Sequence, residues 1–155
     1  MTEVKRIADQ LKRAVNGGAW HGPAIEEILA GITAEQAVSR PFNAAHSIWE
    51  LVLHIDAWLQ GCRRRLEGDR AQLSDAEDWP AVTDTSDRAW KETITAVTQS
   101  YHQLHSEILR LDDSRLEEPI IEGMSSVYIT LHGVIQHTLY HAGQIAILKK
   151  ATSER

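Results

Sequence analysis

The sequence predicts an all-α fold, a four-helix bundle, on the strength of three observations. Apolar residues recur with a period near 3.6 along most of the chain, which indicates amphipathic helices. Glycine, proline and polar stretches separate four long segments of this kind. No segment shows a convincing strand pattern. Four long helices joined by two extended connections are typical of a bundle.

The first predicted helix spans residues 4–15, and the breaker Asn16-Gly17-Gly18 ends it. A continuation follows over residues 23–29, where Pro23 suits the first helical turn. Thr33 and Gln36 then have the spacing of a capping box, which predicts a further short helical turn before Pro41.

The second long helix is predicted to begin at a capping box formed by Ser47 and Glu50, although Asn43 could be an earlier cap, and to end at Gly68. Residues 69–84 are polar and contain Pro80, which predicts a connecting loop.

Two more long helices are predicted in the second half of the chain. The third opens after the capping residues 85–87 and continues to residue 108. Residues 111–125 contain proline and glycine and are predicted to be a second loop. The last helix runs from residue 127 to Lys150, whose charge suits the negative end of the helix dipole.

Length and composition favour one domain over residues 1–155, with enough residues for a sizeable core. Cys62 is the single cysteine, so no intrachain disulfide can form, which fits a reducing compartment. No apolar run approaches the roughly 20 residues that span a membrane. The N-terminus also has no apolar signal-peptide core. We therefore expect a cytoplasmic protein without membrane association.

The formal net charge of −6 argues against nucleic-acid binding, which normally requires a basic surface. The one dense basic run is Arg63-Arg64-Arg65, and Glu67 and Asp69 follow it at once. This pattern is typical of a solvated helix face.

Two histidines one helical turn apart, His137 and His141, are candidates for metal ligands, because residues four apart on a helix share one face. His54, on the second long helix, could supply a third imidazole. On a helical wheel all three lie on the flank of an apolar stripe, where side chains of two helices can converge on a cleft. The spacing alone is compatible with two interpretations: the histidines form a metal site, or they are partly exposed polar side chains.

Neighbouring residues could assist such a site. Gln144 shares a helix face with His137 and could orient a ligand or substrate, and a surface or helix-packing role fits this residue equally well. Glu50 could accept a hydrogen bond from His54, although its capping role is the preferred interpretation. His21 is a candidate substrate contact. Gly133, one turn before His137, would keep the mouth of the site open.

Other residues near these positions are assigned to packing or to the surface. Trp49 and Trp58 could line the cleft or fill the core, and the core is the preferred interpretation. His46 is expected to be a surface or capping histidine.

The segments around His46–Ile55 and Gly133–Ile145 resemble the two signature segments of the DinB-like superfamily, and Ala19–Pro23 looks like the first-helix region of one of its branches. The resemblance implies an up-down-down-up four-helix bundle with a divalent metal at a histidine triad. Carried over by position, the ligands are His54, His137 and His141. It further implies a homodimer, and small-molecule chemistry that uses a low-molecular-weight thiol.

The chemistry of such a triad is open in several respects. Neutral imidazoles suit Zn²⁺, Ni²⁺ and Fe²⁺ alike. A metal with three neutral ligands would lower the pKa of a bound water or deprotonate a bound thiol. The His137–His141 segment lacks the glutamate that zinc proteases carry, which favours a thiol S-transferase over a metal-dependent hydrolase. A non-enzymatic, stress-associated metal-binding module is the third alternative.

Overall fold

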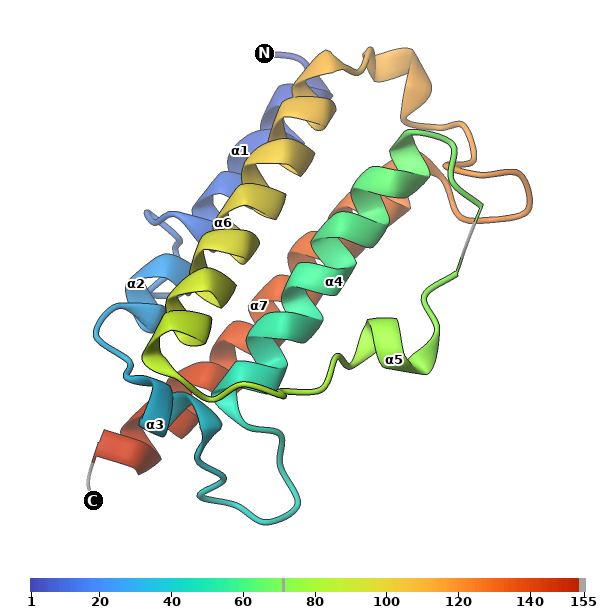
Figure 1. Ribbon diagram of the computed structural model, residues 1–155. Coiled ribbons are helices and arrows are strands. Elements are labelled where there is room, and N and C mark those ends of the chain that lie inside the picture. The colour runs from blue at the N-terminus through green and yellow to red at the C-terminus, as the bar shows by residue number, and fades with distance from the viewer. Residues whose placement is uncertain (71, 154–155) are drawn as a thin grey trace.

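The computed structural model describes residues 1–70 and 72–153. Its four long helices lie side by side in a bundle (Figure 1), and they are α1 (Glu3–Val15), α4 (Ile48–Leu66), α6 (Asp87–Arg110) and α7 (Val127–Ser153). In the view of Figure 1, α1 and α7 run downward while α4 and α6 run upward. The predicted all-α bundle is therefore confirmed, with the helix directions that the resemblance implied.

Short elements occupy the connections between the long helices, and they are α2 (Ile25–Leu29), α3 (Ala34–Val38), α5 (Asp75–Asp78) and the 3₁₀ turn η1 (Asp113–Arg115). The only β pairing in the described part of the chain is an isolated bridge between Pro119 and Ser126. Within residues 1–70 and 72–153, the helices are too short or too polar to cross a membrane.

The connection over residues 69–84 differs from the prediction of a plain loop, because it contains the one-turn helix α5. Ser74 and Glu77 form a capping box there, in which the Ser74 N–H donates to the Glu77 carboxylate at 2.8 Å. This reciprocal bonding stabilises a helical turn within a polar stretch. The helix ends at Asp78, and the next residue, Trp79, precedes Pro80 and is not helical, because the α conformation is disfavoured before a proline.

Local sequence caps the start of α4, whereas a residue far away in the sequence caps α1. The predicted capping box of α4 is present, since Ser47 Oγ accepts from the Glu50 N–H at 3.2 Å and Glu50 Oε2 accepts from the Ser47 N–H at 2.7 Å. The first turn of α1 is capped from a distance. There the Asp113 carboxylate of η1 accepts from the N–H groups of Glu3 and Val4, both at 2.9 Å.

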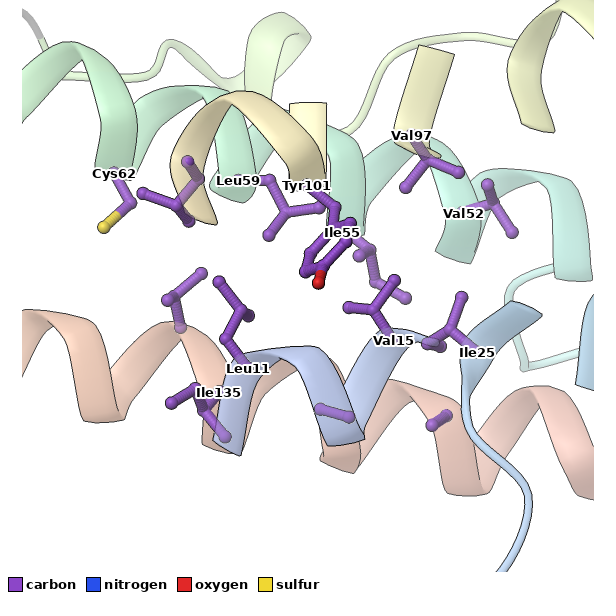
Figure 2. Close-up of a cluster of buried hydrophobic side chains, with 14 of the residues drawn as sticks. Leu11, Val15, Ile25, Val52, Ile55, Leu59, Cys62, Val97, Tyr101 and Ile135 are labelled. Carbon is purple, nitrogen blue, oxygen red and sulfur yellow. The ribbon is translucent and has the colours of Figure 1, made fainter. Parts of the chain in front are cut away.

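The core lies between the four long helices, and Figure 2 shows side chains from all of them meeting there. Leu11 of α1, Leu59 of α4 and Leu104 of α6 are fully buried. α4 packs against both α6 and α7, and α1 also packs against both. This order makes α4 and α7 neighbours along the bundle, which is what brings His54 near His137 and His141.

Candidate metal centre

Three imidazoles meet between α4 and α7. Each of His54, His137 and His141 offers a ring nitrogen, and these three nitrogens all lie within 4.8 Å of one another. His54 Nε2 and His137 Nε2 are 2.9 Å apart. The sequence-predicted histidines are thus brought together by the fold. His54 and His141 are more deeply buried than their flank positions suggested, with 6% and 7% of their surface exposed.

The outward nitrogens of two rings are held by acceptors. His54 Nδ1 lies 2.7 Å from the backbone carbonyl oxygen of Asp78 and 3.1 Å from its carboxylate. His141 Nδ1 lies 2.8 Å from the side-chain oxygen of Gln144. An acceptor opposite Nδ1 favours the tautomer with the proton on Nδ1, which leaves the Nε2 lone pair available. Both rings are therefore oriented as metal-binding imidazoles are.

An aromatic stack fixes the ring of His54 from the side. The Trp79 indole lies parallel to the His54 ring at a centroid distance of 3.8 Å, and the His46 ring covers the other face of the indole, also at 3.8 Å. His46, expected as a surface or capping histidine, thus contributes to this stack although its side chain remains half exposed. The stack restricts rotation of the His54 imidazole.

The surroundings of His137 and His141 favour neutral imidazoles. Burial, together with the neighbouring His141 and His54, lowers the pKa of His137 from 6.5 to about 4. Burial also lowers the pKa of His141, against the hydrogen bond that its Nδ1–H donates to the Gln144 side-chain oxygen, which raises it. Imidazole binds a metal only in its neutral form, so this environment matches what a metal site requires.

The residues present fit a divalent ion. Zn²⁺ binds imidazole nitrogen at about 2.0–2.1 Å, so two nitrogens that share one ion lie within roughly 4.2 Å of each other. The His54–His137 pair meets this limit, and the three nitrogens together, which lie within 4.8 Å of one another, come close to it. Without an ion, a proton on one of the two Nε2 atoms bridges the 2.9 Å between them, and a bound cation would take the place of that proton. Among the described residues, His137 Nδ1 is buried without a hydrogen-bond partner, so the protein supplies two of the three outer acceptors.

A cavity of about 300 Å³ opens beside His137 between α4 and α7. Gly133 lines it. Apart from the backbone of its own helix and its two chain neighbours, no heavy atom of the described residues lies within 4 Å of the place where a Cβ on this glycine would be. The half-buried Trp58 also lines it, which corrects the prediction that this tryptophan is a core residue. The Trp58 indole N–H donates to the Asp78 carboxylate at 2.7 Å. Trp49 does lie in the core, 2% exposed.

The remaining predicted residues lie elsewhere. Glu50 has the capping role, and its carboxylate also pairs with the guanidinium of Arg40. No hydrogen bond between Glu50 and His54 occurs among the described residues. His21 is exposed after α1, where it lines a cavity of about 420 Å³ that no triad histidine lines. Gln144 alone of these three contacts the triad.

Asp78 and Trp79 are the site residues that the sequence analysis missed. Both belong to the connection over residues 69–84 and reach His54 across 24 or more positions of the chain. The Ser74–Glu77 capping box directly before them was the available signal, because it marks an ordered turn. Nothing in the sequence indicated which helix this turn faces.

Comparison with known proteins places these features in a family. The model of the DinB superfamily matches residues 19–145, a range that contains the whole triad. The crystal structure of a conserved protein from Enterococcus faecalis resembles this fold with a TM-score of 0.76, over 100% of this chain and 99% of that chain, at 16% sequence identity. No curated protein matches the chain. Because the family match spans most of the sequence, the chain belongs to the DinB superfamily.

Proposed function

We propose that the protein holds a divalent metal ion through His54, His137 and His141 and activates a low-molecular-weight thiol for transfer to an electrophile. The observation that carries this proposal is the convergence of three imidazole nitrogens beside an accessible cavity. The ion, when bound, supplies a positive charge that favours the thiolate form of a bound thiol. Zn²⁺, Ni²⁺ and Fe²⁺ all suit the nitrogen donor set.

The chain's own residues favour thiol chemistry over hydrolysis. Hydrolysis needs a general base for water, and Thr138 stands where zinc proteases have their glutamate. Its hydroxyl is buried and donates to the Val134 carbonyl oxygen at 2.8 Å. The Asp78 carboxylate is engaged by Trp58 and His54. A thiol loses its proton far more readily than water, so it needs no such base.

The reaction balances without a redox partner. The thiol proton passes to solvent, the sulfur forms a bond to an electrophilic carbon, and a leaving group such as halide departs with its bonding electrons. His54 and His141 are held in position by Asp78 and Gln144, while the cavity beside His137 admits the reactants.

A conjugation assay tests the proposal. Metal-loaded protein is mixed with a chlorinated nitroarene and, in turn, cysteine, glutathione, coenzyme A and 2-mercaptoethanol, and thioether formation is followed by absorbance. We expect turnover that requires both metal and thiol, is lost in His137→Ala, and persists in His102→Ala, which changes an exposed histidine of α6.

Two outcomes would contradict thiol transfer. Turnover of an ester substrate without thiol would indicate the hydrolase. A metal-loaded protein that accelerates neither reaction would indicate a metal-binding module without enzymatic activity.

A further inference from the structure

The cavity beside the triad contains a cationic group that no residue in the described part of the chain neutralises. Its walls come from α4 and α7, which lie next to each other in the bundle (Figure 1), and include Trp58, Cys62, Arg65, Ile129, Gly133 and His137. None of the described residues that line it is acidic. The chain as a whole carries a net charge of −6, so a cavity lined by a cation and by no acidic residue differs from the chain's overall acidic character.

Arg65 differs from the two arginines that precede it. Arg63 pairs with Glu67 at 2.6 Å, and Arg64 pairs with Asp69, also at 2.6 Å. Among residues 1–70 and 72–153, Arg65 has no carboxylate partner. Its Nε is buried without a hydrogen-bond partner, as the Nε of Arg63 also is, but Arg63 is neutralised through its Nη1 by Glu67. Buried guanidinium nitrogens are normally satisfied, because desolvating a charged group is costly. The run was expected to be a solvated face, and Arg65 departs from that expectation.

The surroundings of Arg65 suit a ligand with an apolar body. Its guanidinium carbon lies 5.4 Å from the centroid of the Trp58 ring, which places the charge over an aromatic face. Trp58 is fixed by its hydrogen bond to Asp78, so it forms a rigid wall. Gly133 leaves the opposite side open. Burial raises the pKa of the Cys62 thiol, which therefore stays neutral and does not repel an anion.

We propose that this cavity binds a small organic anion whose carboxylate pairs with Arg65, whose apolar body lies against Trp58, and whose other end faces His137. The planar guanidinium matches a carboxylate with two parallel hydrogen bonds. The inference rests on the proposed function, since it identifies part of the thiol or of the acceptor. Either reactant can carry the carboxylate.

Binding of a matched pair of probes tests the charge requirement. Zn²⁺-loaded protein is titrated with 3-phenylpropionate and with its neutral amide, and the NMR signal of the Trp58 indole N–H reports binding. We expect the carboxylate to bind at least about tenfold more tightly, because a charge-assisted hydrogen bond replaces an unpaired buried donor. Arg65→Gln should remove the preference, Arg65→Lys should restore part of it, and Arg63→Gln should leave it intact.

Equal binding of carboxylate and amide would overturn the proposal. So would a preference that survives in Arg65→Gln and vanishes in metal-free protein, because the carboxylate would then bind the metal. Metal content and thiol turnover are measured on the same samples. If both are absent while the Arg65-dependent preference persists, the thiol transferase proposal fails and the anion site stands.

Kinetics with metal-loaded enzyme distinguish the two sources of the anion. If the thiol carries it, Arg65→Gln raises the KM for 3-mercaptopropionate and leaves that for 2-mercaptoethanol unchanged. If the acceptor carries it, the same substitution raises the KM for a chloronitrobenzoate and spares its neutral amide. Unchanged KM values in both pairs would contradict the proposal.

Discussion

Gln144 is the residue outside the triad whose role follows most directly from a contact. Its side-chain oxygen lies 2.8 Å from His141 Nδ1 and fixes the orientation of that ring. We expect Gln144→Ala to weaken metal affinity by about tenfold to a hundredfold, the usual effect of removing such a partner. Competition with a chromophoric chelator measures this affinity.

Gln136 provides the matched control for Gln144. It is exposed on the same helix, and Gln136→Ala should bind metal like the wild type. Equal affinities in the two variants would show that the contact with His141 does not support the site.

Cys62 predicts a pH dependence of stability. Burial raises the pKa of its thiol from 9.0 to about 12, so between these values the native state keeps a proton that the unfolded state releases. The contribution to stability is complete below pH 9 and is lost as the pH rises toward 12, by about 1.4 kcal/mol for each pH unit.

Urea denaturation of wild type and Cys62→Ala at pH 8 and pH 10 measures this effect. Between the two pH values, the free energy of unfolding should fall more in the wild type than in the variant. The pH dependence that remains in the variant comes from other titrating groups. Tyr101 is one of them, because burial raises its pKa to about 12 as well. Parallel losses in the two proteins would contradict the assignment.

Side-chain partners of the site could be predicted from the sequence only where they lie close to the histidines along the chain. The spacing of His137 and His141 on one helix predicted their proximity, and Gln144, three residues after His141, was a recognisable candidate. Asp78 and Arg65 were not, because their roles depend on which helices become neighbours. That arrangement is set by packing of the whole bundle.

The start of α4 is the element boundary on which the position of His54 depends. Ser47 is 2% exposed and caps the helix reciprocally with Glu50. Ser47→Ala should lower the free energy of unfolding by about 1 kcal/mol, because it leaves a helix N–H without its acceptor. Urea denaturation measures the change.

Ser106→Ala is the control, since Ser106 is exposed within α6. It should change stability by less than about 0.5 kcal/mol. If the two variants lose the same stability, the capping box does not contribute measurably to folding.

The long helices were predictable because each combines a clear apolar period with recognisable ends. The box of Thr33 and Gln36 was also correctly identified from sequence and opens α3. α5 was missed because its four residues are too few to show a period, and none of the four is buried. Only its capping residues marked it.

At the scale of the whole molecule, α7 leaves apolar side chains uncovered. Ile129, Tyr140 and Ile147 are 59%, 67% and 62% exposed. They lie within roughly 20° of one another on a helical wheel. Gly143 lies beside them with open space around its Cα. Such a row of exposed apolar residues favours contact with another protein surface.

We predict that a second copy of the chain covers this face of α7 as a homodimer. Light scattering should give twice the chain mass of 17.4 kDa, and Tyr140→Glu with Ile147→Glu should give the monomer. Leu109→Glu, which changes an exposed residue of α6, should remain dimeric. A monomeric wild type would contradict the prediction.

The overall architecture followed from the sequence because helix period, breakers and the absence of strand patterns agreed. The bundle order did not follow from period alone, since α1, α4, α6 and α7 can pack in several arrangements. The order became predictable only through the resemblance to a family, and the helix directions in Figure 1 agree with it.

The sharpest test of the metal centre is elemental analysis of protein that has been loaded with Zn²⁺ and dialysed. The triad predicts about one ion per chain in the wild type and in His102→Ala, and less than about a tenth of that in His54→Ala and His141→Ala. Circular dichroism establishes that the variants are folded. Near-stoichiometric metal in both folded triad variants would contradict the site.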